Sequence, residues 1–334
     1  MMRSRLSDWR LWCLAAATIL CVVTAVVPRI ERLRPVYDVM AIIDITGSMN
    51  TRDMKSAGLP GGDSVRSRLD AAKSAVSGLL QDLPCQSRLG LGVFTERRSF
   101  VLFNPVEVCE NFAAIDAGIA GLDWRMGWEG DSLVGKGVYS ALTIAAQLKA
   151  DVVFLTDGHE APPLPIGAQL YEFDGDAGHV KGLIVGVGGD AKVPIPKFDD
   201  DGRLSGVYSA QDVPQENHSG PPPKDAESRP GYHPKWAPYG KTEVEGDEHL
   251  TSVRGEYLTR LAGQVGLGYA PLTSMSSILK PLAPALTPRE VVVAVDVRPL
   301  LGGLALFILS LVYAAPLVQR AARVLPYGNP GVSP

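Results

Sequence analysis

The sequence has little cysteine, little charge and no basic stripe, and each shortage excludes a class of protein. Only 4 of the 334 residues are cysteine, and two of them lie in apolar runs, which excludes a disulfide-dense mini-protein and a zinc site of four cysteines. The net charge of −4 argues against nucleic-acid binding. Hydrophobic residues make up 46% of the chain, too large a share for an intrinsically disordered protein. The length suits one large domain or two modest ones.

Two uncharged apolar runs lie near the ends of the chain, at residues 11–27 and 300–318. Each approaches the roughly 20 residues that cross the hydrocarbon core of a bilayer. The first run could also be a cleaved signal peptide, but Pro28-Arg29-Ile30-Glu31-Arg32 follows it without a small-residue cleavage site. The second could be a buried core helix, but Arg320 and Arg323 follow it directly. We therefore expect two transmembrane helices.

Two spans would leave residues 1–10 and 319–334 on one side of a membrane and residues 35–297 on the other. A small excess of arginine beside the termini favours cytoplasmic ends. Residues 35–297 hold 23 of the 32 basic and 34 of the 36 acidic residues, a net charge of −11. We expect this segment to face the periplasm from a bacterial inner membrane. Cys85 and Cys109 could form a disulfide there or remain two buried thiols, and the sequence leaves both open.

The segment between the apolar runs alternates two patterns, apolar runs typical of buried strands and apolar residues at helical spacing. The predicted strands are 36–44, 88–94, 99–103, 152–155 and 181–187. The predicted helices are 112–122, 131–148, 249–264 and one that Asp63 or Ser64 caps and that ends near Leu83. This alternation predicts an α/β fold with a doubly wound, mostly parallel sheet. Such sheets bind ligands at the carboxyl ends of their strands.

Residues 191–248 are different, because they contain many prolines and few apolar runs. A long segment of this kind is usually functional or disordered. Asp199-Asp200-Asp201-Gly202 resembles the start of a calcium loop, but the later glutamate of such a loop is missing, so an acidic turn in solvent is favoured. The predicted organisation is a core of residues 35–190, a proline-rich extension of 191–248, and a C-terminal part of the domain with a linker at 249–297.

Polar residues follow two of the predicted strands. Asp44-Ile45-Thr46-Gly47-Ser48 closes the first strand, and Thr156-Asp157-Gly158 closes the strand at 152–155. Two hydroxyls two residues apart in a tight loop can point at one centre, and we expect Gly47 to permit the turn. Hydroxyl and carboxylate oxygens are ligands that a small hard cation prefers. The sequence therefore predicts a divalent-cation site at this edge of the sheet.

This Asp-x-Thr-x-Ser loop, paired with a Thr-Asp-Gly loop, resembles the metal-ion-dependent adhesion site of von Willebrand factor type A domains. The resemblance covers about residues 35–190 and implies the Rossmann-like fold of that family. The implied ligands of Mg²⁺ or Ca²⁺ are Asp44, Thr46, Ser48, Ser132 and Asp157. The hydroxyls would ligate directly, and the two carboxylates directly or through water. Ser132 stands where the family more usually has threonine, and the neighbouring Asp131 either contributes to the site or caps a helix.

Other interpretations of these residues are less favourable. An aspartic-protease motif is excluded because Ile45 interrupts it, and a dinucleotide loop at 186–191 would need a helix that Pro194 and Pro196 forbid. His159 has no second histidine at metalloprotease spacing, so we expect a loop residue near the metal. A turn and a helix cap without a metal remain an alternative. No nucleophile or general base is arranged for turnover, so we expect a protein that is not an enzyme.

The family resemblance implies a divalent-cation-dependent binding module, to whose metal a client protein supplies an Asp or Glu. The two apolar runs and the segments 44–49, 155–163 and 246–269 are also similar to the MxaL-type proteins of methylotrophic bacteria. Those proteins are associated with maturation, including calcium insertion, of a periplasmic methanol dehydrogenase that uses pyrroloquinoline quinone. The implied partners are that dehydrogenase and co-encoded membrane assembly proteins. An aerotolerance-type membrane scaffold working with an AAA-type ATPase and a metal-dependent hydrolase stay open as alternatives.

Overall fold

The computed structural model describes most of the chain in two compact units. The described residues are 9–26, 30–55, 65–127, 131–164, 168–199, 201–215, 224–233, 246–272 and 278–324. One unit comprises Met1–Arg34 with Glu290–Pro334, and the other comprises Pro35–Arg289. Of the expected cytoplasmic tails, residues 1–8 and 325–334 lie outside the described residues.

The first unit consists of two helices and a two-stranded sheet. Helix α1 (Trp9–Val26) contacts helix α7 (Arg298–Val324), and β1 (Ile30–Val36) pairs with β14 (Arg289–Val295). By length and composition α1 can cross a bilayer, a test that a signal sequence also passes. The apolar stretch described in α7, Arg298–Ala314, is shorter than a membrane span. The second expected transmembrane helix therefore stays a prediction.

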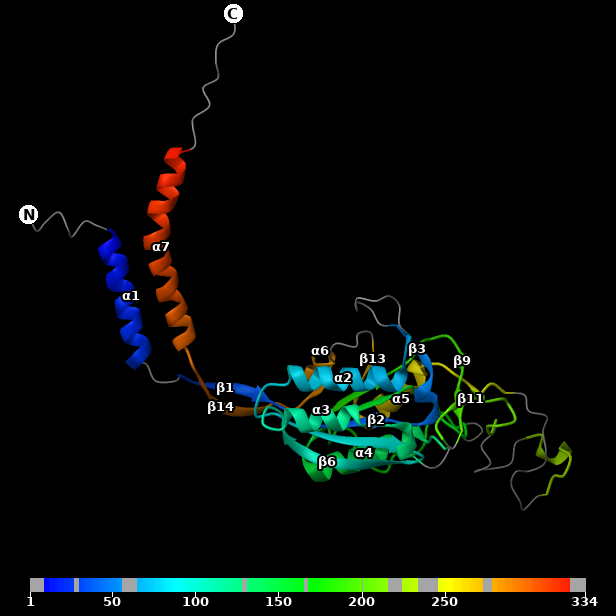
Figure 1. Ribbon diagram of the computed structural model, residues 1–334. Coiled ribbons are helices and arrows are strands. Elements are labelled where there is room, and N and C mark those ends of the chain that lie inside the picture. Colours follow the sequence, from blue (N-terminus) through cyan, green and yellow to red (C-terminus); the bar gives the residue numbers. More distant parts are fainter. Residues whose placement is uncertain are drawn as a thin grey trace, which may run out of the picture. The chain divides into compact units, whose positions relative to one another are not determined.

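A six-stranded sheet forms the centre of the second unit, in the order β13-β8-β7-β2-β5-β6 (Figure 1). Its strands are β2 (Asp38–Asp44), β5 (Arg88–Thr95), β6 (Arg98–Glu107), β7 (Asp151–Thr156), β8 (Gly182–Gly186) and β13 (Gly268–Pro271). All neighbours are parallel except β6, which returns antiparallel to β5 after a two-residue turn. The prediction of a mostly parallel sheet is therefore confirmed. The edge strand β13 was not expected from the sequence.

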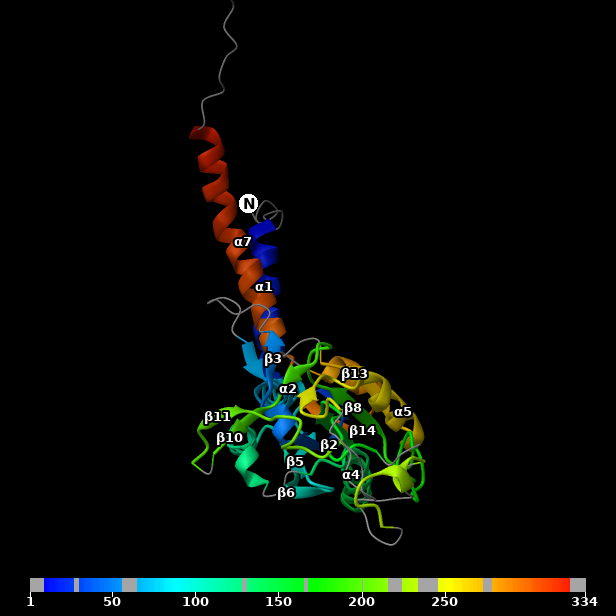
Figure 2. The same cartoon turned by 90° about the vertical axis from the view of Figure 1, so that its right-hand side faces the viewer.

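Helices cover both faces of this sheet, as the doubly wound fold requires. On one face α2 (Arg68–Asp82) lies beside α3 (Phe112–Ala120) and packs on alternate residues of β2, such as Ile43. On the other face α4 (Val134–Leu148) and α5 (Gly255–Val265) pack on the residues between, such as Ile42, and α5 contacts β8 and β13 (Figure 2). Because alternate side chains of β2 are buried in the cores on the two faces of the sheet, its sequence is apolar without interruption.

The predicted bounds of four helices differ from the structure. α2 begins at Arg68, where Ser67 caps it by accepting a hydrogen bond from the backbone N–H of Asp70 at 3.0 Å. Asp63 and Ser64, the expected caps, lie outside the described residues. α3 ends at Ala120 rather than at residue 122.

The other two differences arise because strand pairing takes up residues that look helical. α4 begins at Val134 rather than at residue 131, because Ser132 forms β-bridges before it. α5 begins at Gly255 rather than at residue 249, because β12 (Leu250–Thr251) pairs with β9 (Val193–Pro194). The expected strand 99–103 is likewise longer, since β6 runs from Arg98 to Glu107.

The extension forms short elements that pair mainly with one another. The hairpin of β10 (Pro196–Phe198) and β11 (Leu204–Val207) is antiparallel. The acidic turn between its strands is internally paired, since Asp199 accepts a hydrogen bond from the backbone N–H of Arg203 and Asp201 pairs with the Arg203 guanidinium. Asp200 lies outside the described residues. The remaining short elements are β3 (Arg52–Lys55), β4 (Val65–Ser67), α6 (Leu279–Leu282), and 3₁₀ turns at Gly47–Asn50, Trp124–Met126, Ala226–Ser228 and Ala283–Ala285.

Cys85 and Cys109 form a disulfide, with their Cα atoms 5.3 Å apart. This resolves the alternative that the sequence left open. The bond ties the segment that precedes β5 to the segment that follows β6, so it holds the antiparallel edge of the sheet. Closing a loop of this length stabilises a domain by about 3 kcal/mol. The other two cysteines, Cys13 and Cys21, are free thiols in α1.

Candidate metal centre

The expected ligands lie on three loops at the carboxyl edge of the sheet. β2 ends at Asp44, and Thr46 and Ser48 follow in the short turn after it. β7 is the parallel neighbour of β2, so Asp157, which directly follows β7, emerges beside Asp44. The order of the strands thus explains why two motifs more than a hundred residues apart meet.

Ser132 reaches the same edge through backbone pairing. Its N–H donates to the carbonyl of Ala161 at 2.6 Å, and the N–H of Ala161 donates back to Ser132 at 2.8 Å. The next residue, Leu133, donates to the carbonyl of Glu96 at 2.6 Å. The segment before α4 is therefore held between the turn after β5 and the loop after β7. The structure brings all five expected residues together.

Three hydroxyl groups at this edge have lone pairs free for a cation. Thr46 Oγ1 donates its proton to Asp44 Oδ1 at 2.7 Å, which leaves its lone pairs unused. Ser48 Oγ and Ser132 Oγ are buried and meet no hydrogen-bond partner among the described residues, although Ser48 lies near enough to Asp157 to favour the charged form of that carboxyl. Buried hydroxyls without partners are costly, and an oxygen-seeking cation would satisfy both.

Asp44 is fully buried, and its protonation is sensitive to charge. Burial and the negative charge of Asp157 together raise the pKa of Asp44 to about 7. Hydrogen bonds donated by Thr156 Oγ1 at 2.6 Å and by the backbone N–H of Thr46 at 2.9 Å act in the opposite direction. A bound cation would favour the ionised form, so the group suits a cation site.

Arg68 is a functional residue of this site that the sequence did not reveal. It is fully buried, and it donates to Asp157 Oδ2 at 2.5 Å, to Asp53 Oδ2 at 2.6 Å and to Thr251 Oγ1 at 2.9 Å. Burial by itself would raise the pKa of Asp157, but the positive charge of Arg68 lowers it overall. Asp157 therefore stays ionised, and Arg68 balances part of its charge.

The position of Arg68 explains why no sequence signal marks it. It is the first residue of α2, where an arginine usually lies in solvent, and only the pairing of four distant segments buries it. Asp53, its second carboxylate, lies on β3 and accepts a hydrogen bond from the backbone N–H of Gly189 at 3.0 Å. These ion pairs and the hydrogen bond from Gly189 thus connect α2, β3, the end of β7 and the loop after β8.

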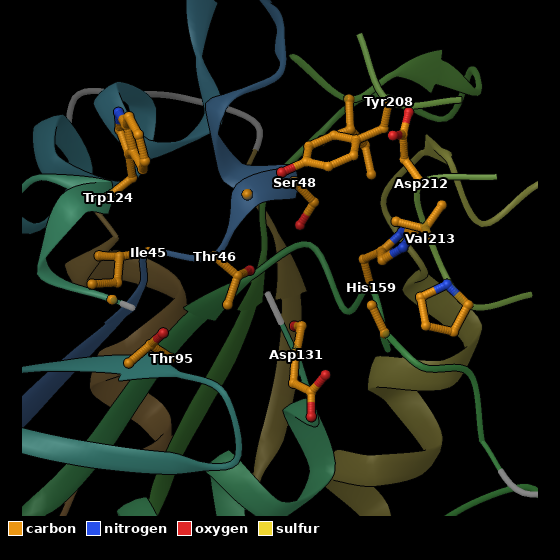
Figure 3. A pocket seen from close by; sticks show the side chains of 16 residues that line it. Ile45, Thr46, Ser48, Thr95, Trp124, Asp131, His159, Tyr208, Asp212 and Val213 are labelled. Carbon is orange, nitrogen blue, oxygen red and sulfur yellow. The ribbon is translucent and has the colours of Figure 1, made fainter. Parts of the chain in front are cut away.

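The residues that carry the three hydroxyls, Thr46, Ser48 and Ser132, line a cavity of about 350 Å³. Figure 3 shows Thr46 and Ser48 near its middle, Trp124 and Ile45 at one side, and Tyr208 and Val213 at the other. Its lining residues are Ile45, Thr46, Gly47, Ser48, Thr95, Trp124, Gly127, Asp131, Ser132, His159, Ala161, Ile195, Tyr208, Asp212, Val213 and Pro214. Asp44 and Asp157 do not reach the cavity surface, so they act on it through their charge and through the hydroxyls.

Three further expectations are settled by the geometry around this cavity. Asp131 lines it and does not cap α4, in whose first turn the backbone N–H of Gly135 donates to Glu160 Oε1 at 2.8 Å instead. His159 is buried against it, and burial together with the charge of Arg254 lowers its pKa, so the imidazole is neutral. Gly47 has an ordinary backbone conformation, so the turn does not need a glycine there; Gly158, with φ of +78°, does.

Comparison with known proteins identifies the fold. Residues 39–159 match the von Willebrand factor type A domain family. No curated protein matches the chain.

Solved structures with similarity to this chain include three from bacteria. An aerotolerance-related membrane protein from Bacteroides fragilis is 16% identical, with 75% of this chain and 98% of that chain covered and a TM-score of 0.44. A von Willebrand factor type A structure from Catenulispora acidiphila is 17% identical, with coverages of 48% and 37% and a TM-score of 0.31. An uncharacterized membrane-spanning protein from Vibrio fischeri is 19% identical, with coverages of 70% and 91% and a TM-score of 0.27.

Members of the matched family often bind a divalent metal at a metal-ion-dependent adhesion site. The sheet order and the covering helices agree with this match, and the second unit, in which residues 39–159 lie, has the von Willebrand factor type A fold.

Proposed function

We propose that this chain is a membrane-anchored, divalent-cation-dependent protein-binding module and not an enzyme. The observation that carries the proposal is the group of three hydroxyl oxygens beside two buried carboxylates; two of these oxygens are buried and meet no hydrogen-bond partner in the described part of the chain. This all-oxygen set fits Mg²⁺ or Ca²⁺. The anchors are residues 11–27 and 300–318 in a bacterial inner membrane, with residues 35–297 in the periplasm.

In this proposal the hydroxyl and carboxylate side chains have different roles in holding a cation. Thr46, Ser48 and Ser132 would hold it through their hydroxyls, and Asp44 and Asp157 would supply negative charge directly or through water. A bound cation would supply a coordination position open to the cavity, where a carboxylate of a partner protein binds. Arg68 keeps Asp157 ionised and in place while it offsets part of its charge. These oxygens would therefore balance only part of the charge of a divalent ion. The remaining positive charge would attract an anionic group of the partner.

The cation site is tested by titrating Mg²⁺ and Ca²⁺ into the full chain in detergent by calorimetry. Replacing Ser48 and Ser132 by alanine together should weaken binding by at least about tenfold, since two of the three hydroxyl ligands are removed. Ser228→Ala is the matched control, because Ser228 is exposed on a distant turn. Equal affinity of the double variant and the control would overturn the proposal.

The narrower proposal is that the client is a periplasmic methanol dehydrogenase, which this chain helps to mature by calcium insertion. It rests on the similarity of residues 44–49, 155–163 and 246–269 to the MxaL-type proteins. The test is capture of partners by the full chain from solubilised membranes and periplasm of its own cells, with Ca²⁺ or with chelator, and with Ser48→Ala. Cation-dependent capture of the dehydrogenase and of membrane assembly proteins would support it. Capture of an AAA-type ATPase instead would favour the aerotolerance-type scaffold.

A further inference from the structure

The extension after β8 covers part of the cation edge. Five of the cavity's lining residues come from it: Ile195, Tyr208, Asp212, Val213 and Pro214. They flank or follow the β10–β11 hairpin, which is seated on the loop before α4. There the Trp124 ring stacks on Phe198, with ring centroids 5.0 Å apart and planes 27° apart. A wall of the cavity is therefore built from a segment that lies beyond the residues matched to the family, 39–159.

This wall is held in place by its own polar contacts. The Asp212 carboxylate accepts hydrogen bonds from Lys197 Nζ at 2.7 Å, from the Ser209 backbone N–H at 2.8 Å and from Ser209 Oγ at 2.7 Å. The backbone N–H of Tyr208 donates to Ile195 at 2.9 Å. Residues 208–212 are thus tied to β10 and to the residue before it, and Lys197 Nζ also lies 5.6 Å from the centroid of the Tyr208 ring.

The size of the cavity restricts what can reach the hydroxyls. Its volume of about 350 Å³ is at the small end of ligand pockets, which span about 300–1,000 Å³. A typical protein interface covers about 800 Å² on each partner, and a surface of that size does not fit inside a cavity of this volume. A partner therefore has to present a narrow projecting group.

The lining has two distinct parts. Around Thr46, Ser48 and Ser132 it is polar, and the carboxylates Asp131 and Asp212 also line it, each in an ion pair with a more exposed base, Arg97 or Lys197. Among the described lining residues His159 is the one basic side chain. The carboxylates in and beneath this part of the lining disfavour a further carboxylate, and a bound cation would attract one. Away from the hydroxyls, Trp124 and Tyr208 offer flat apolar surfaces on opposite sides of the cavity (Figure 3).

We propose that this cavity binds an acidic residue with an aromatic or aliphatic neighbour in a projecting peptide segment of the client. The carboxylate lies at the hydroxyl end, and the neighbouring apolar side chain lies between Trp124 and Tyr208. The extension thereby sets the specificity of the domain, because it supplies Tyr208 and seats Phe198 on Trp124. This inference rests on the proposed cation-dependent binding function and names the chemistry of its ligand.

The test compares small blocked peptides on the full chain in detergent with Mg²⁺, by calorimetry. The probes are N-acetyl-Phe-Asp-amide, N-acetyl-Asp-amide and N-acetyl-Phe-Asn-amide. We expect the first to bind about tenfold more tightly than the second, because an aromatic contact is worth about that factor. The third, which has no carboxylate, should not bind, and chelator should abolish binding of the first two. The free acid 3-phenylpropanoate should bind more weakly than the Phe-Asp probe; tighter binding would overturn the peptide source.

Two variants locate the apolar contact. Tyr208→Ala and Trp124→Ala should each reduce the advantage of the Phe-Asp probe and leave the affinity for N-acetyl-Asp-amide and for Mg²⁺ unchanged. Tyr232→Ala, outside the cavity, is the matched control, and Tyr208→Leu should retain part of the advantage. Equal binding of the two Asp probes, or an unchanged advantage in Tyr208→Ala, would overturn this inference while the cation site stands. If the parent chain itself does not bind Mg²⁺, the proposed function is overturned, and this inference with it.

Discussion

Arg68 joins the buried carboxylate of Asp157 to the partly buried carboxylate of Asp53, and its removal would leave both without their counter-charge. We expect Arg68→Met to lower the free energy of unfolding by about 3–5 kcal/mol, because the Met side chain fills a similar volume but leaves Asp53 and Asp157 uncompensated. Urea denaturation of the full chain in detergent measures this loss. Arg66→Met, which removes a more exposed arginine on β4, should cost less than about 1 kcal/mol.

A cation should compensate for part of that loss. Mg²⁺ brings positive charge beside Asp157, so the difference between Arg68→Met and the parent chain should shrink when Mg²⁺ is added. An unchanged difference would show that Asp157 does not sense the cation. Arg68→Lys should recover only part of the stability, because lysine cannot donate to two carboxylates from a rigid planar fork.

Glu160 should make stability depend on pH. Its Oε1 accepts hydrogen bonds from the backbone N–H of Gly135 at 2.8 Å and from the Tyr257 hydroxyl, whereas its buried Oε2 has no partner among the described residues. Burial raises the pKa of Glu160 from 4.5 to about 7. Between those values the folded chain keeps a proton that the unfolded chain has released. The free energy of unfolding therefore falls as the pH rises from about 4.5 to 7, and its total decrease is on the order of 3 kcal/mol.

Glu160→Gln isolates this contribution, because glutamine stays neutral at every pH. The parent chain and the variant should differ most in the change of unfolding free energy between pH 5 and pH 8, measured by denaturation in chelator. The pKa of Asp44 is also raised to about 7. The unfolding free energy of the variant should therefore still fall as the pH rises, by less than that of the parent chain. Identical pH profiles for the two chains would contradict the assignment to Glu160.

At the scale of elements, helix α4 packs tightly on the sheet at Gly137, whereas Gly263 lies on the exposed side of α5. A Cβ at Gly137 of α4 would lie 2.2 Å from the Phe94 ring on β5, while nothing lies within 4 Å of a Cβ at Gly263 of α5. Gly137→Ala should therefore lower the free energy of unfolding by about 1–3 kcal/mol through overpacking. Gly263→Ala should raise it by about 0.5–1 kcal/mol, since alanine favours the helix. Denaturation of the two variants side by side checks both signs.

The elements also show which patterns are readable in a sequence and which are not. β2 and β7 were predictable because burial on both faces demands an unbroken apolar run. β12 and the bridge at Ser132 were not, because two or three residues of backbone pairing leave no periodicity, and residues 131–133 and 249–254 look like helix starts. The cap of α2 at Ser67 was missed for a similar reason, since several polar residues before a helix could serve as its cap.

For the whole molecule, binding of a cation should be visible as added stability of the second unit. A ligand that binds only the folded state at 100 times its dissociation constant stabilises it by about 2.7 kcal/mol. Mg²⁺ at that ratio should raise the denaturation midpoint of the full chain, and chelator should reverse the shift. Ser48→Ala combined with Ser132→Ala should abolish the response. A shift that survives in this double variant would place the cation elsewhere.

The sequence by itself determined the fold class and the loops that supply the proposed ligands. Apolar runs report burial, and Asp44, Thr46, Ser48 and Asp157 stand in short motifs directly after such runs. Arg68, Asp53 and the extension's Tyr208 became part of the site only through tertiary structure. Their roles depend on contacts between segments that are distant in the chain. A buried ion pair or a cavity wall is a property of several segments in space, and no single stretch of residues encodes it.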